Sequence, residues 1–471
     1  MSRPAIRIAA AAAAAVAVLA FPGTALGHAL NRAYESQLPL VVYLAGAGLA
    51  VALSFAFVLL RDLRADPPSL DSPTFEPPRP IRVVLRSLGV IGWVWIVAQG
   101  ILGGTSDADV ATLFVWVYTW VGVAIVSAFV GPIWQWLDPF STLHDIGAWI
   151  LRRLGVGGLD PGDYPRGLGQ WPAVVGIAFV VWLELVLKLG VGRTLFIAVV
   201  GYTALTLAMM AQFGRDAWRA NGETFNVWFR LIGRLAPFAL ADETGRLRRR
   251  SFASGLLEPG WTVAQVVLVA LGAGSILFDG LSQTTPWYEV FGAPPIPVAT
   301  LQLAGFLGLI VLAALAVSRL VGIASTGAGL MPIAIGYLVA HYLTYLLYDG
   351  QRIVIAISDP LQQGSDLFGT AFFQPVAFLP PGLVWTIQLV AVVGGHMIGA
   401  WGGHVVAARS PARGDVRLRM VPLAVVMVAL TTITLWSLGQ SIVQPPQSTA
   451  AAHLAREDLA RGGSGGHNQP G

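Results

Sequence analysis

Arginine residues fall in every second loop between the apolar segments of this chain. The Arg-rich loops cover the regions Arg61 to Arg86, Arg152 to Arg166, Arg215 to Arg250 and Arg409 to Arg419. The loops between them, near Ser106, Asp279 and Gly364, carry few cations or none. Short cationic loops are retained on the cytoplasmic side of a membrane. The alternation therefore predicts an integral membrane protein whose Arg-rich loops face the cytoplasm.

Ten apolar segments each approach the ~20 residues that an α-helix needs to cross the hydrocarbon of a bilayer. They cover residues 38–60, 84–104, 110–133, 171–190, 194–212, 262–278, 299–318, 329–348, 383–407 and 420–440. We therefore expect an all-α fold, a polytopic transmembrane helix bundle of about ten spans, over residues 28–443. An even number of spans with an outside start places both ends of the mature chain on the extracytoplasmic side. Residues 444–471, rich in Gly, Ser and Gln, are expected to form a disordered extracytoplasmic tail.

The composition agrees with a lipid environment. Of the 471 residues, 55% are hydrophobic and only 11% are charged, which is too little charge to cover a soluble globule of this size. The basic residues flank the membrane segments and form no aromatic-interleaved surface, so we expect the lipid bilayer as a partner and no nucleic acid. The chain has no cysteine, so a metal ion would need histidine and carboxylate ligands.

Residues 1–27 have the form of a secretory signal peptide. Arg3 and Arg7 precede an apolar core, residues 9–21, that is too short to span a bilayer, and residues 25–27 are Ala-Leu-Gly, suitable for cleavage. Cleavage there would make His28 the first residue outside the membrane, where its amine and imidazole would together chelate copper or zinc. The alternatives are an uncleaved anchor and a terminal histidine without a role.

The eighth apolar segment has the most unusual polar face. Tyr337, His341 and Tyr345 recur every four residues and lead toward Asp349, so they share one side of a helix. Ionisable groups at membrane depth generally face the bundle interior, a cavity or a partner. We therefore expect a functional centre in the outer half of the bundle, with His341, Tyr345 and Asp279 as catalytic residues. The alternatives are a packing network around His341 and a simple turn at Asp279.

The fourth apolar segment carries two charged residues. Glu184 and Lys188 are four residues apart, a spacing that favours an ion pair on one helix face. We expect mutual neutralisation, with proton coupling through Glu184 as the alternative.

The ninth apolar segment combines histidines with a glycine ridge. His396 and His404 lie among Gly395, Gly399 and Gly403, whose four-residue spacing predicts close approach of another helix. His396 beside such a contact is expected to be either a ligand or a structural hydrogen-bonding group.

Three loop segments have their own character. Residues 140–154 and 223–238 are amphipathic and are expected to lie as helices in the membrane interface. The outer loop 349–381 is long and aromatic, so we expect it to be ordered and to form a lid over the outer centre. In this loop Asp359 starts a turn and Asp366 precedes a short apolar run.

Four stretches carry a resemblance to a known family. They are GHALNRAYESQLPL, HYLTYLLYDGQ, SDPLQQGSDLFGTA and VWTIQLVAVVGGHMIGAWGGH. Together they resemble the fenitrothion hydrolase family of bacterial polytopic membrane proteins, over most of the chain after residue 27. The resemblance implies a bacterial inner membrane location and cleavage of an aryl phosphorothioate ester. The matching positions are His28, His341, Asp359, Asp366, His396 and His404.

Phosphotriester hydrolysis needs an activated water, usually at a metal with several His or Asp ligands, and charge stabilisation at the phosphoryl oxygen. We therefore expect a metal-assisted organophosphate hydrolase that has an outward-facing site, acts on a small-molecule substrate and binds zinc or copper. The expected ligands are His28, His341, His396, Asp349 and Asp359.

Two other functional classes stay open at this point. One is a membrane transporter or accessory subunit with a polar path along the eighth segment, where Gly327, Gly329 and Pro332 would allow a broken helix. The other is an extracytoplasmic metal-handling protein that receives copper or zinc through His28. The sequence has no His-Glu-x-x-His, Gly-x-Ser-x-Gly or phosphate-binding Gly-rich motif that would name a reaction.

Overall fold

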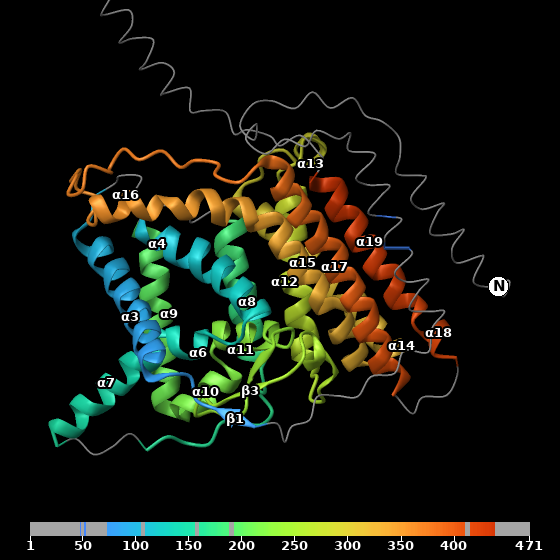
Figure 1. The fold of residues 1–471 in the computed structure, drawn as a ribbon, viewed down its shortest axis with the longest axis horizontal. Coiled ribbons are helices and arrows are strands. Elements are labelled where there is room, and N and C mark those ends of the chain that lie inside the picture. The colour runs from blue at the N-terminus through green and yellow to red at the C-terminus, as the bar shows by residue number, and fades with distance from the viewer. Residues whose placement is uncertain are drawn as a thin grey trace, which may run out of the picture.

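The computed structural model describes residues 48, 51–52, 73–104, 109–155, 160–187, 193–409 and 415–438. This part of the chain is mostly helical (Figure 1), in agreement with the expected all-α fold class. The predicted signal peptide, nearly all of the first predicted span and the predicted tail lie outside the described residues, as do His28 and Lys188.

Within the described residues, seven helical segments are long and apolar enough to cross a membrane. They are α3 (Arg79–Leu102), the run of α4 (Val110–Thr112), η2 (Leu113–Val123) and α5 (Ala124–Phe129), α9 (Arg193–Phe213), α12 (Val263–Ser282), α14 (Ile296–Val321), α15 (Ile323–Asp349) continued by η4 (Gly350–Arg352) and α16 (Ile353–Ser358), and α17 (Pro381–Ala408). Two shorter apolar helices are α8 (Trp171–Leu185) and α19 (Val421–Leu438). Each corresponds to one of the last nine predicted apolar segments.

Short elements complete the described chain. They are α6 (Trp134–Leu137), α7 (Pro139–Arg153), α10 (Arg215–Asn221), α11 (Thr224–Ile232), η3 (Ser254–Leu257), α13 (Thr285–Phe291), α18 (Val416–Arg419), and the strands β1 (Thr74–Phe75), β2 (Phe238–Leu240) and β3 (Leu247–Arg249). The strands form an antiparallel sheet in the order β1-β3-β2, with Arg248 opposite both Thr74 and Ala239.

Several helices begin at side chains that cap them. Asp109 and Asp138 accept hydrogen bonds from the first backbone N–H groups of α4 and α7, and Glu223 does the same for α11. Thr262 and Gln265 form a reciprocal capping box at the start of α12. These caps satisfy donors that have no partner within the helix, which fixes where each helix starts.

The glycine ridge of α17 packs against α15, which confirms the expected close approach. A Cβ atom on Gly395 would lie 2.4 Å from the carbonyl oxygen of Pro332, and one on Gly399 would lie 2.3 Å from that of Gly329. The helix break that Gly327, Gly329 and Pro332 would allow under the transporter alternative does not occur, because α15 continues through Pro332. Neighbouring helices support a proline inside a membrane helix by packing around it, and α17 lies against this turn.

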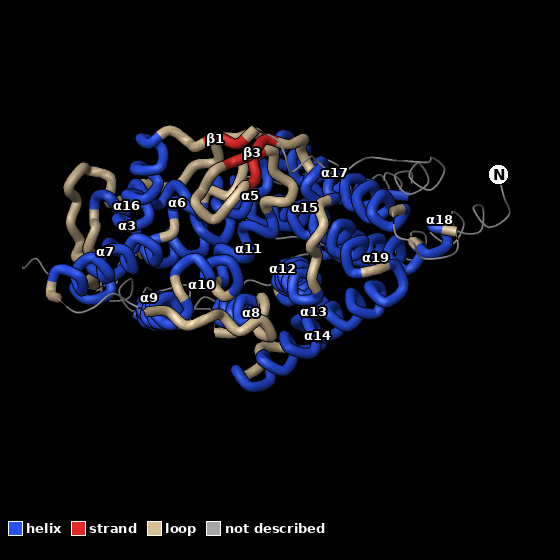
Figure 2. Tube along the Cα trace, turned by 90° about the horizontal axis from the view of Figure 1, so that it is seen from below, coloured by secondary structure: helices blue, strands red, loops and turns tan. Residues whose placement is uncertain are grey.

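The two ends of the helical bundle differ. Figure 1 shows α13 and α16 at one end, and α10, β1 and β3 at the opposite end. Figure 2, viewed from the latter end, shows the strands along one side of the helices. The sheet contains Arg248 and Arg249, so this is the Arg-rich end of the molecule.

The two amphipathic segments have different environments. Helix α7 exposes the apolar side chains of Ile146, Trp149 and Ile150, as expected of a helix at a membrane interface. In α11, by contrast, all residues except Arg230 are buried. The interface prediction is therefore wrong for α11, because its polar side chains find partners inside the protein and the helix is covered on every side.

Candidate functional site

Asp279 and His341 form a pair inside the bundle. Asp279 lies in the last turn of α12, and His341 lies in the second half of α15. Atom Nε2 of His341 is 2.9 Å from Oδ2 of Asp279. The side chains keep 18% and 15% of their surface exposed, respectively. The pair is therefore mostly enclosed by protein.

Tyr342 connects this pair to a second carboxyl group. Its hydroxyl oxygen is 3.1 Å from Oδ2 of Asp279 and 3.2 Å from Oε1 of Glu184 in α8. A tyrosine hydroxyl has a single proton and can also accept a hydrogen bond. Both contacts are therefore satisfied together only when one carboxyl group is protonated and donates to the tyrosine oxygen while Tyr342 donates to the other.

Asp279 has more donors around it than Glu184. The amide Nε2 of Gln283, one turn further along α12, donates to Oδ1 of Asp279 at 2.6 Å. With His341 and Tyr342, three side chains are thus able to donate to Asp279. Hydrogen bonds to a carboxylate stabilise its charged form. This arrangement favours the charge on Asp279 and the proton on Glu184.

The structure gives Glu184 a partner other than the one expected from sequence. Its described hydrogen bond comes from Tyr342, 158 positions away in the chain. Lys188, expected as its ion-pair partner, lies outside the described residues.

The polar side chains of α15 that were expected to share one face contact different parts of the protein. Tyr337 is fully buried and donates to a threonine of α19 at 2.9 Å. The ring of Tyr345 packs against that of Tyr342, with centroids 6.3 Å apart. Asp349 forms an ion pair with Arg352 at 2.9 Å. Tyr342, rather than Tyr345, is therefore the tyrosine with a described hydrogen bond to the Asp279–His341 pair.

The histidines of α17 lie in the helix core. Nδ1 of His396 is 2.8 Å from Oγ1 of Thr431, which also accepts the hydrogen bond of Tyr337. His404 is also buried. Within the described residues, no three His, Asp or Glu side chains gather closely enough to hold a metal ion. The structure therefore does not bring the expected ligands His341, His396, Asp349 and Asp359 together.

Asp359 and Asp366 organise the outer loop. Asp359 is buried and accepts hydrogen bonds from the backbone N–H groups of Gln363 and Gly364 at 2.9 and 3.0 Å. Asp366 accepts from the hydroxyl of Ser358 at 2.8 Å, and hydrogen bonds from nearby backbone N–H groups hold its pKa below the usual range. Both aspartates thus have a structural role in shaping the loop.

The loop is anchored on α3. The carbonyl oxygen of Pro360 accepts hydrogen bonds from Trp95 at 2.8 Å and from Gln99 at 3.3 Å. The backbone N–H of Gly104 donates to the carbonyl of Leu361 at 3.1 Å. The loop is ordered, as expected, but these contacts hold its first part on the end of α3.

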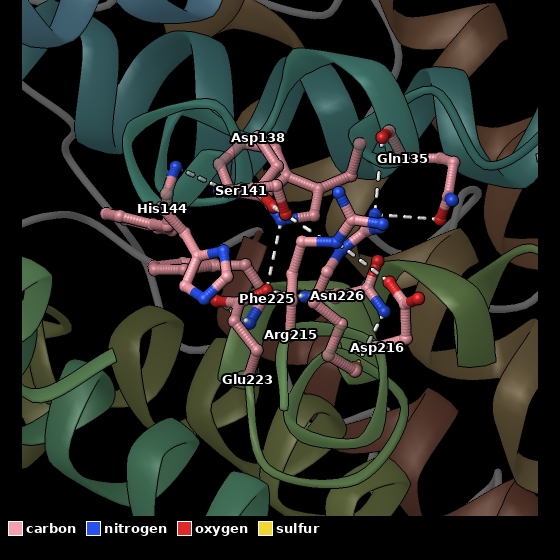
Figure 3. Close-up of polar contacts among 12 residues, drawn as sticks. Gln135, Asp138, Ser141, His144, Arg215, Asp216, Glu223, Phe225 and Asn226 are labelled. Carbon is pink, nitrogen blue, oxygen red and sulfur yellow. Dashed lines mark hydrogen bonds and ion pairs between the residues drawn. The ribbon is translucent and has the colours of Figure 1, made fainter. Parts of the chain in front are cut away.

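A second buried polar cluster lies among α6, α7, α10 and α11 (Figure 3). Oδ2 of Asp138 is 3.5 Å from Nε of Arg219, and both side chains are almost completely buried. Glu223 accepts hydrogen bonds from Tyr202 at 2.6 Å and from Trp134 at 3.1 Å. Burial raises the pKa of Asp138, and burial together with the charge of Asp138 raises that of Glu223 to about 7. The cluster joins four short helices and is best explained as structural.

Sequence reasoning did not identify Tyr342 or Gln283. Gln283 lies four residues after Asp279 and therefore on the same helix face, which is a signal that could have been used. Tyr342 follows His341 directly and points to a neighbouring side of the helix. Its importance depends on α8 and α12 both lying next to it, which no local pattern encodes.

The chain matches no protein-family model, no curated protein sequence and no solved structure. The resemblance to the fenitrothion hydrolase family therefore rests on the sequence stretches alone.

Proposed function

We propose that this protein is a multi-pass membrane protein that transfers protons inside the bilayer through Glu184, Tyr342, Asp279 and His341. The observation that supports this most directly is the position of the Tyr342 hydroxyl, within hydrogen-bonding distance of both carboxyl groups. Chains of carboxyl groups and histidine at membrane depth are typical of proton relays in pumps and transporters. Proton-coupled transport is accordingly the function that the geometry supports best.

The transfer can be written with all atoms balanced. Glu184 gives its proton to the oxygen of Tyr342 while Tyr342 gives its own proton to Asp279. Tyr342 ends unchanged, Glu184 becomes a carboxylate and Asp279 becomes neutral. In the resting state His341 carries its proton on Nε2 and donates it to Asp279. Once Asp279 is neutral, the imidazole shifts to the tautomer with its proton on Nδ1, and Nε2 takes the proton from Asp279. His341 is then an imidazolium, and Asp279 is charged again beside it.

The proposed setting is a bacterial inner membrane protein with a cleaved signal peptide, ten spans and both mature ends outside. Twenty-one of the 29 Lys and Arg residues fall in loops on the side taken as cytoplasmic. In this arrangement α13 and α16 lie at the outer end, and the Asp279–His341 pair lies in the outer half of the bundle. The bilayer and a transported small molecule are the proposed partners.

The proposal is tested with Tyr342→Phe, which keeps the ring and removes the bridging hydroxyl. Purified protein is reconstituted in liposomes with a pH-sensitive dye inside, and a membrane potential is imposed. Wild-type protein is expected to conduct protons, and Tyr342→Phe to lose about 100-fold or more of that flux, the size typical of a lost proton-transfer group. Tyr337→Phe is the matched control, since it removes a buried hydroxyl from the same helix outside the chain of four. Equal flux in both variants would refute the relay.

Hydrolysis of a phosphotriester is the second candidate, because the contact with Asp279 orients the imidazole of His341 as a general base requires. Zinc or copper usually takes three or more such donors, and the described residues bring no three together. Release of nitrophenolate from an aryl phosphotriester provides the test. Turnover that Asp279→Asn lowers about 100-fold would favour the hydrolase. A wild-type protein without turnover would eliminate it.

A further inference from the structure

A partly open cavity of about 220 Å³ lies at the Arg-rich end of the bundle. Its walls come from α11, from the start of α12, and from β2 and β3 of the small sheet. Its walls include β3 and the start of α12, whereas Asp279 lies in the last turn of α12, next to α13, which is at the opposite end from β3 (Figure 1). The cavity is therefore a separate site, independent of the proton relay.

The lining of this cavity is strongly basic. It includes the four arginines Arg230, Arg234, Arg248 and Arg250, and a single acidic side chain, that of Glu258. Glu258 is shared, because its Oε1 lies 2.8 Å from Arg248 and 2.6 Å from Arg250. Arg230 pairs with a different acidic side chain, Glu243, at 2.8 Å. Four guanidinium groups against these two carboxylates leave two positive charges in the cluster.

Two of these arginines, Arg250 and Arg234, interact with other groups of the protein. Arg250 donates to Glu258, to the carbonyl of Ala236 and to that of Gly233. Arg234 donates to the carbonyl of Glu258 at 3.1 Å and lies over the ring of Trp261, 4.4 Å from its centroid. Both guanidinium groups are therefore occupied with groups of the protein itself.

Arg248 differs from them. Its side chain keeps only 7% of its surface exposed, and its Nη2 donates to Glu258. Its Nη1 is also buried but has no hydrogen-bond partner among the described residues. A buried charged donor without an acceptor costs about 1–3 kcal/mol or more, so such groups in native proteins generally have a hydrogen-bond partner, which is a protein group, a water molecule or a ligand. Arg248 lines the cavity, so an acceptor bound there would lie beside this guanidinium group.

We propose that this cavity binds a phosphate-bearing anion, held by Arg248 and by the surplus positive charge of the cluster. A guanidinium group presents parallel N–H donors that match the oxygens of a phosphate group. A phosphate also carries up to two negative charges at neutral pH, equal to the surplus of the site. The group could belong to a soluble phosphate or to the headgroup of an anionic lipid, because basic sites between membrane helices on the cytoplasmic side bind such headgroups.

The sheet supplies a matched pair of variants. Arg248→Gln removes the buried charge that faces the cavity. Arg249→Gln removes the same charge from the next residue, which is exposed and is absent from the cavity lining. The two proteins have the same net charge, so a difference between them reports on the cavity and not on general electrostatic attraction.

Each variant is tested as the full-length protein in a neutral detergent, first with inorganic phosphate and then with cardiolipin. Binding of phosphate is followed by the rise in melting temperature, and binding of cardiolipin by native mass spectrometry. If phosphate binds wild type and Arg249→Gln about tenfold or more tightly than Arg248→Gln, a soluble phosphate is supported. If only cardiolipin shows this difference, the lipid headgroup is supported. If the two variants behave alike with both probes, the proposal is overturned.

Ala239→Asp provides an independent variant that keeps Arg248 in place. Ala239 lines the cavity and is the register partner of Arg248 on β2. A carboxylate there would take the place of the ligand, so the melting temperature without phosphate should rise and the responses to both phosphate and cardiolipin should disappear. A protein that still binds either probe as tightly as wild type would overturn the proposal even if Arg248→Gln fails to fold.

Discussion

His341 and Asp279 contact each other at 2.9 Å although 62 positions separate them in the sequence. The contact joins α15 to the end of α12, at the point where Tyr342 also reaches Glu184 of α8. Three helices thus bring their ionisable side chains to one place. In a membrane interior such a gathering is unfavourable unless the groups satisfy one another or take part in function. Here they do satisfy one another, in an order that permits proton movement.

The first prediction concerns His341→Ala. We expect the variant to fold and to insert in the membrane, because Asp279 keeps its hydrogen bonds from Gln283 and Tyr342. Proton flux in liposomes should fall about 100-fold or more, since the terminal acceptor of the relay is gone. Glu184→Gln should show a similar loss, because its described partner is Tyr342. A folded Glu184→Gln protein with full flux would contradict the relay.

The second prediction concerns the contact between α15 and α17. Gly399→Ala places a Cβ atom 2.3 Å from a backbone carbonyl oxygen, so one helix has to move. Overpacking of this kind costs about 1–3 kcal/mol, and the melting temperature in detergent should fall by several degrees. Gly394→Ala on the same helix is the control, since a Cβ there meets nothing within 4 Å. That variant should melt at or slightly above the wild-type temperature.

Features that depend on local spacing were predictable from the sequence. Segment length and hydropathy located nine helices of the described chain, and the four-residue spacing of Gly395 and Gly399 identified a packing face. The choice of partners was not predictable, because contacts such as Glu184 with Tyr342 depend on how distant helices pack. The interface assignment failed for α11 because an amphipathic pattern does not distinguish lipid headgroups from a polar protein interior. Glu223 and Asn226 have partners inside the protein.

The third prediction concerns pH and Glu223. Its pKa in the folded protein is about 7, against about 4.3 for an exposed glutamate. The folded state therefore binds this proton more tightly than the unfolded state, so the stabilisation is fully present below about pH 4.3 and is lost as pH rises toward 7. In Glu223→Gln this contribution is absent. The melting temperature of wild type relative to that of the variant should fall between about pH 5 and 7 and then level off. If the melting temperature of wild type minus that of Glu223→Gln instead rises between about pH 5 and 7, the raised pKa of Glu223 is contradicted.

The fourth prediction concerns processing. Because the apolar core of residues 9–21 is short and the cleavage region consists of small residues, the mature protein should begin at His28. N-terminal sequencing of protein purified from membranes gives the answer directly. Recovery of Met1 would show an uncleaved anchor and would remove the free amine of His28 as a metal ligand.

The fifth prediction is that the sheet and the loop around Gly364 lie on opposite sides of the membrane. In the structure they belong to opposite ends of the bundle, with β3 at one end and the segment that follows α16 at the other (Figure 1). Positive charge in short loops places the sheet inside. A reporter that is active only after export should therefore be inactive when fused after Arg249 and active when fused after Gly364. The reverse pattern would move the Asp279–His341 pair to the cytoplasmic half and the basic cavity to the outer surface, where a cytoplasmic phosphate or inner-leaflet lipid would not reach it.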